Sequence, residues 1–116
     1  MIRRALLLAL AAGMALGTAG CSVGKSIHEH PCPPAGTSLT YDNFGRGFVA
    51  EWCVRCHGGA NGYSSRAFTS LDSIRSQRDR IFINAAADNG SMPPGPDGPS
   101  QTERNELADW LACGAP

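Results

Sequence analysis

Two thiols and one imidazole lie within about one helical turn of each other in this sequence. They belong to a Cys-x-x-Cys-His run at Cys53, Val54, Arg55, Cys56 and His57. At this spacing the thiols can add to the two vinyl groups on one edge of a porphyrin, and the imidazole can approach the iron. The run therefore predicts one covalently bound haem c, attached through Cys53 and Cys56, with His57 as the proximal axial ligand.

Two other kinds of site use the same residue types. A redox dithiol does not need the histidine, and it usually opens a helix in a thioredoxin-like βαβ pattern, which this sequence lacks. A zinc knuckle needs four nitrogen or sulfur ligands, but the sequence has no second Cys-x-x-Cys and no His-x-x-x-His pair. His28 and His30 could bind a metal or supply a distal haem ligand, although histidines in such a polar segment are more often solvated. The haem interpretation is therefore favoured.

The first twenty residues have the organisation of a secretory signal peptide. Two arginines precede an apolar run that is too short for a membrane-spanning helix, and small residues then lead to Cys21. This ending looks like a bacterial lipoprotein signal, in which the cysteine is lipidated, although Thr18 stands where such signals favour Leu. We expect a lipid anchor at Cys21 on a bacterial membrane, facing the periplasm or the cell surface. The alternative is ordinary cleavage near Ala19, which leaves Cys21 as a stray thiol.

The remaining sequence predicts a tether and a small helical domain. Residues 21–38 are rich in Pro and Gly and lack an apolar period, which predicts a flexible tether before a domain at 39–116. Apolar stripes predict helices over 41–56 and 71–88, the second ending at an Asn89-Gly90 stop. A third helix should begin at the Ser100–Glu103 capping box and end before Gly114.

The formal net charge of the chain limits the classes of macromolecule that it could bind. Without the signal peptide the chain has a formal charge of −2 and no cluster of basic residues, which argues against a nucleic-acid surface. Three arginines of the second helix could hold haem propionates or dock a partner, although a solvated helix face is the more common role; they are Arg75, Arg78 and Arg80.

Residues 40–112 resemble the class I cytochromes c. The resemblance implies an all-α fold of three to four short helices around one covalent haem. In that family the distal ligand is a methionine in a loop well after the haem motif. Here Met92 is the only methionine outside the signal peptide, and it lies in a Met-Pro-Pro loop. The family fold also implies that the first and last helices cross closely. Gly45 stands eight residues before Cys53, where the family has its crossing glycine, and Trp110 would pack there.

Two further features accompany this helix crossing. Glycine at both Gly45 and Gly47 suggests close helix approach, and Phe48 lies on the apolar stripe of the same helix. The segment that enters the first helix would then lie near the end of the last helix. Cys32 and Cys113, which remain once the other cysteines are assigned to lipid and haem, are expected to form a disulfide because export permits disulfides.

The predicted function is one-electron transfer rather than catalysis. An iron with His57 and Met92 as axial ligands has no open position for a substrate, so its partners would be redox proteins that bind transiently. Two alternatives remain: a haem enzyme or a gas or peroxide sensor with an open distal site, and a non-haem interaction module stapled by zinc or a disulfide.

Many class I cytochromes place a proline carbonyl against the proximal histidine. No proline lies between Pro34 and Pro93 here, so the sequence names no acceptor.

Overall fold

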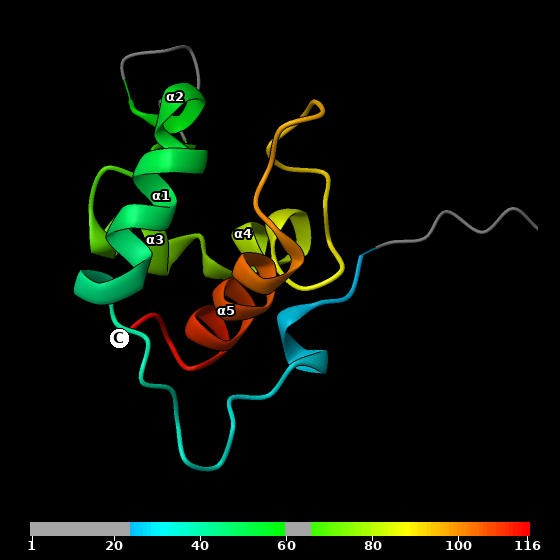
Figure 1. Ribbon diagram of the computed structural model, residues 1–116. Coiled ribbons are helices and arrows are strands. Elements are labelled where there is room, and N and C mark those ends of the chain that lie inside the picture. The colour runs from blue at the N-terminus through cyan, green and yellow to red at the C-terminus, as the bar shows by residue number, and fades with distance from the viewer. Residues whose placement is uncertain (1–23, 60–65) are drawn as a thin grey trace, which may run out of the picture.

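The computed structural model describes residues 24–59 and 66–116. The expected signal peptide at 1–20 and the expected lipidation site at Cys21 lie outside these ranges. The described chain is helical and has no strand, which confirms the all-α prediction (Figure 1). Its helices are η1 (Ile27–Glu29), η2 (Tyr41–Gly45), α1 (Arg46–Trp52), α2 (Val54–His57), α3 (Leu71–Ser76), α4 (Arg78–Ala85) and α5 (Gln101–Ala112). Within the described ranges, none of them has both the length and the apolar character needed to cross a membrane.

The first predicted helix forms in three pieces rather than one. Thr40 caps it, since its hydroxyl accepts from the Asn43 N–H at 3.1 Å and its own N–H donates to Asn43 Oδ1 at 2.7 Å. A π-helical turn, η2, comes first, and α1 follows. The helix breaks at Cys53, where φ is −115°. The Cys53 carbonyl accepts from the N–H groups of both Cys56 and His57, so the haem motif forms a short helical turn of its own.

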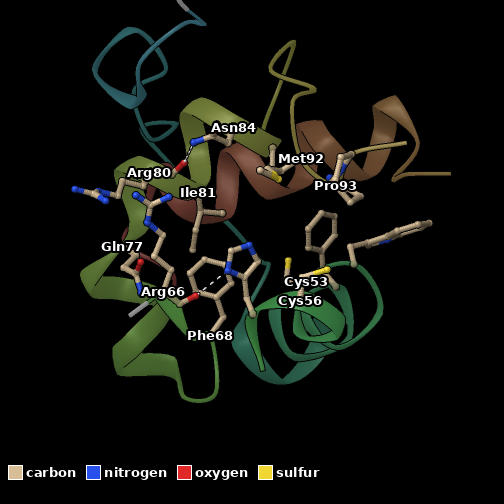
Figure 2. Close-up of a pocket in the computed structure, with 15 residues that line it drawn as sticks. Cys53, Cys56, Arg66, Phe68, Gln77, Arg80, Ile81, Asn84, Met92 and Pro93 are labelled. Atoms are coloured by element: carbon tan, nitrogen blue, oxygen red, sulfur yellow. Dashed lines mark hydrogen bonds between the residues drawn. The ribbon is translucent and has the colours of Figure 1, made fainter. Parts of the chain in front are cut away.

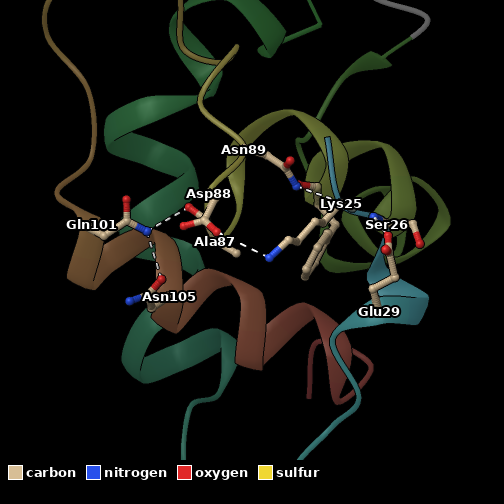
Figure 3. Close-up of polar contacts among 9 residues, drawn as sticks. Lys25, Ser26, Glu29, Ala87, Asp88, Asn89, Gln101 and Asn105 are labelled. Carbon is tan, nitrogen blue, oxygen red and sulfur yellow. Dashed lines mark hydrogen bonds and ion pairs between the residues drawn. The ribbon is translucent and has the colours of Figure 1, made fainter. Parts of the chain in front are cut away.

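The second predicted helix is divided at Gln77 and ends earlier than expected. Ser70 caps α3, and α4 ends at Ala85 rather than at residue 88. The left-handed residue that follows is Ala87, with φ of 53°, so the prediction of an Asn89-Gly90 stop is wrong. The Asn89 side chain is buried, and its amide donates to the carbonyls of Lys25 at 2.9 Å and Phe82 at 3.1 Å (Figure 3).

The last helix, α5, forms as predicted. Ser100 and Glu103 make the reciprocal capping box, and Gly114 adopts φ of 94° just past the helix end. One face of α5 packs into the core beside α4 (Figure 1). The chain then returns to the start of the first helix, where the Pro116 carbonyl accepts from the Tyr41 N–H at 2.7 Å.

The first and last helices meet at Gly45. A Cβ atom there would overlap the indole ring of Trp110, which is fully buried. A Cβ atom at Gly47 would meet nothing within 4 Å, so the expectation of close approach at this second glycine is wrong. Phe48 is buried in the same core, and Phe44 meets the Trp110 ring edge-on at 6.0 Å.

Residues 24–38 differ from the flexible tether that the sequence suggested. Ile27 in η1 is buried, and His30 Nε2 lies 2.8 Å from a carboxylate oxygen of Asp109 on α5. Cys32 pairs with Cys113 at the end of α5, with Cα atoms 4.7 Å apart. Isolated proline and glycine residues give no tertiary signal, so the expected Cys32–Cys113 disulfide was the one feature of the sequence that placed this segment against the domain.

Candidate functional site

A cavity of about 410 Å³ opens between three parts of the domain. The haem-motif turn forms one wall, α4 forms another, and the loop around Met92 covers the side facing the cysteines (Figure 2). Its volume lies in the range of small-molecule and cofactor sites, and its walls are mostly apolar, including Phe48, Phe68 and Ile81. The cavity therefore brings together residues that are distant in the sequence.

The two motif cysteines line this cavity, and neither is in a disulfide. Burial raises the pKa of the Cys53 thiol to about 12, while Cys56 is exposed. A redox dithiol needs the opposite, a thiol whose pKa is lowered by nearby positive charge or a helix amino terminus. The Cys53 thiol therefore lacks the property that a redox dithiol needs.

His57 is oriented by two neighbours that the sequence did not identify. Its Nδ1 lies 3.0 Å from the carbonyl oxygen of Arg66. Because a carbonyl can only accept, Nδ1 must carry the proton, and the neutral ring then has its lone pair on Nε2, the atom suited to ligate iron. The Phe68 ring stacks on the imidazole with centroids 4.7 Å apart, and the Phe68 N–H donates to the His57 carbonyl. The Arg66 carbonyl thus accepts the hydrogen bond of His57 Nδ1–H. The sequence could not identify this acceptor, because it is a backbone atom that every residue type carries.

Met92 lies across the cavity from Cys53 and Cys56 (Figure 2). The residue is 42% exposed, so it is not part of the core. Its backbone N–H donates to the Asn84 carbonyl at 2.8 Å, which ties the loop to α4. A thioether therefore faces the same space as the two thiols and the imidazole.

Polar side chains line the part of the cavity away from the cysteines. They are Arg66, Gln77 and Arg80 (Figure 2). Among the described residues neither of these two arginines has a carboxylate within 4 Å in an ion pair. Haem carries its propionates on the edge opposite its vinyl groups. A porphyrin attached at the cysteines would thus direct its carboxylates toward two guanidinium groups, and the donor set fits a haem c.

The other sequence candidates lie elsewhere. Arg75 donates to the Ala115 carbonyl at 3.0 Å, and Arg78 lies 3.7 Å from the Asp79 carboxylate. His28 and His30 do not line the cavity. Across the described ranges, no three His, Cys, Asp or Glu side chains gather as metal ligands, so a zinc knuckle has no support there.

The comparison with protein families identifies the domain. A family model described as cytochrome c oxidase, cbb3-type, subunit III matches residues 43–111, which is more than half of the chain. Comparison with curated proteins and with solved structures found no match. The matched region begins before the haem motif and ends within α5, so it includes the whole described cavity. The chain belongs to the cbb3-type subunit III family of class I cytochrome c domains, which bind haem and transfer electrons.

Proposed function

We propose that this protein is an exported, lipid-anchored electron carrier with one haem c. Cys53 and Cys56 would hold the haem, and His57 and Met92 would ligate its iron. The observation that carries the proposal is that the motif turn and Met92 face each other across one cavity (Figure 2). The membrane anchor is Cys21, and the Cys32–Cys113 disulfide links the start of the domain to its last helix.

The residues of the cavity have distinct roles in this proposal. Bound haem c would supply an iron that accepts and releases one electron, and His/Met ligation raises the reduction potential of that iron. The Arg66 carbonyl keeps the proton on His57 Nδ1, and the Phe68 ring fixes the imidazole plane. Apolar walls at Phe48 and Ile81 limit the access of water. Ligation by both His57 and Met92 leaves no coordination position for a substrate, which favours a carrier over an enzyme.

Arg66 and Arg80 would hold the haem propionates. Both line the cavity away from the cysteines, and a guanidinium group matches a carboxylate with two parallel hydrogen bonds. Holding the propionates would orient the haem in its plane, independently of the two thioether bonds.

Acid–acetone extraction and a redox-titrated spectrum of the exported protein test the proposal. The haem should stay on the protein in extraction, and the Cys53→Ala, Cys56→Ala double variant should lose it. Met92→Ala should abolish the weak sulfur-to-ferric-iron band, lower the potential and allow carbon monoxide to bind the ferrous form. His30→Ala is the matched control, because His30 was the other distal candidate but lies outside the cavity. A Met92→Ala spectrum equal to that of the unaltered protein would refute the ligand assignment.

A further inference from the structure

Arg104 on α5 directs its guanidinium group at backbone carbonyls. Its Nη1 lies 2.8 Å from the Ala85 oxygen, 3.1 Å from the Asn89 oxygen and 3.0 Å from the Met92 oxygen. Among the described residues it makes no ion pair within 4 Å. The side chain is half-buried, so these carbonyl dipoles stabilise its charge together with solvent.

The three carbonyls belong to one connection, which runs from the end of α4 to the Met92 loop. Ala85 is the last residue of α4, where an arginine also interacts favourably with the helix dipole. The Ala87 N–H donates back to the Arg104 carbonyl at 2.9 Å, so one residue of α5 holds the connection through both its side chain and its backbone. Gln101 adds a bond from its side-chain amide to the Ala87 carbonyl at 2.9 Å (Figure 3).

Met92 is thereby held through both of its backbone polar groups. Its N–H donates to the Asn84 carbonyl at 2.8 Å, and its carbonyl accepts from Arg104. Gly98, later in the same loop, also packs on the Arg104 guanidinium, since a Cβ atom at this position would lie 3.2 Å from Nη2. The Met92 backbone therefore has a fixed place, although its side chain is exposed.

We propose that Arg104 is a positioning residue that keeps the Met92 sulfur at the iron. The inference rests on the proposed function. A neutral thioether is a weak ligand for ferric iron, so the loop itself must keep the sulfur in place. A cation that bonds the Met92 carbonyl supplies this constraint from a helix that is anchored in the core.

The test measures how easily added imidazole displaces Met92 from the ferric holoprotein. Arg104→Leu keeps aliphatic bulk but removes the donors, and Arg104→Gln removes the charge while keeping an amide. Both variants should bind imidazole at least about tenfold more tightly than the unaltered protein, equivalent to about 1.4 kcal/mol. Their sulfur-to-iron band should also fade at a lower temperature. Arg104→Lys keeps a cation and three donors, so its imidazole affinity should lie between that of Arg104→Leu and that of the unaltered protein.

Arg75→Leu is the matched control, because Arg75 also donates to a backbone carbonyl, that of Ala115, away from the Met92 loop. It should lower thermal stability without changing imidazole affinity by more than about twofold, equivalent to about 0.4 kcal/mol. Imidazole binding by Arg104→Gln equal to that of Arg75→Leu would overturn the inference, even if Arg104→Leu does not fold. If Met92→Ala itself binds imidazole no more tightly than the unaltered protein, the ligand assignment fails and the role of Arg104 fails with it.

Discussion

Gly45 and Gly47 are two residues apart, yet substitution by alanine should have opposite effects on stability. The Gly45 backbone is helical, with φ of −58° and ψ of −44°, so alanine there causes no backbone strain. Its Cβ would overlap the Trp110 indole, a fully buried ring that cannot move without disturbing the core. At Gly47 the same methyl group would meet nothing within 4 Å.

The expected magnitudes follow from these surroundings. Overpacking a core costs about 1–3 kcal/mol, and replacing glycine by alanine within a helix gains about 0.5–1 kcal/mol. The Gly45→Ala variant should therefore lose about 2 kcal/mol, because the overlap is with a rigid ring. For a domain of this size that loss lowers the Tm by about 8–16 °C. The Gly47→Ala variant should gain about 0.5–1 kcal/mol, and its Tm should rise by about 2–8 °C.

Thermal and denaturant unfolding of the two haem-loaded variants, followed in the far-ultraviolet and the Soret band, measures both changes. Equal slopes with denaturant would show that only stability differs. The reasoning is refuted if Gly45→Ala is as stable as the unaltered protein, or if both variants lose stability equally. The second result would mean that glycine is needed for helix geometry and not for contact with Trp110.

Three further predictions concern other parts of the chain. Cys32→Ser should lower the free energy of unfolding by about 2–4 kcal/mol, measured without reductant, and adding reductant should bring the unaltered protein to the same value; equal stability of the two would exclude the Cys32–Cys113 bond. Cys21→Ser should release the cytochrome from membranes into the soluble fraction, whereas an unaltered protein that is already soluble would contradict the anchor. Hydrogen bonds from the backbone N–H and then the hydroxyl of Ser100 lower the pKa of Glu103. This carboxylate thus contributes stability above the usual Glu pKa of about 4.3, and the contribution disappears as pH falls through the lowered folded-state pKa. Glu103→Gln should therefore lower the Tm at pH 7, with a difference that vanishes in acid; a constant difference would contradict the charge effect.

The structure differs from the sequence predictions mainly at helix breaks. The apolar stripe over 41–56 has the right extent, but no periodicity reveals the break at Cys53, where φ is −115° and the carbonyl accepts from two N–H groups. The Asn89-Gly90 pair was the strongest local stop signal. The helix instead ends at Ala85, and Ala87 takes the left-handed conformation, while the Asn89 amide donates to the Lys25 and Phe82 carbonyls. The role of Asn89 thus depends on a backbone carbonyl that lies 64 residues away in the sequence, which a local signal cannot include.

The sequence by itself determined the chemistry of the site: the Cys-x-x-Cys-His run, one methionine in a proline-rich loop and amphipathic stripes indicated a haem in an all-α domain. These features consist of residue types and their spacing, which do not depend on how the chain folds. Only the tertiary structure decided which atoms hold the His57 ring and the Met92 loop in place. The Arg66 carbonyl on His57 and the three carbonyls on Arg104 are backbone groups that every residue has. Their selection depends on where the folded chain brings them, so no residue pattern could show it.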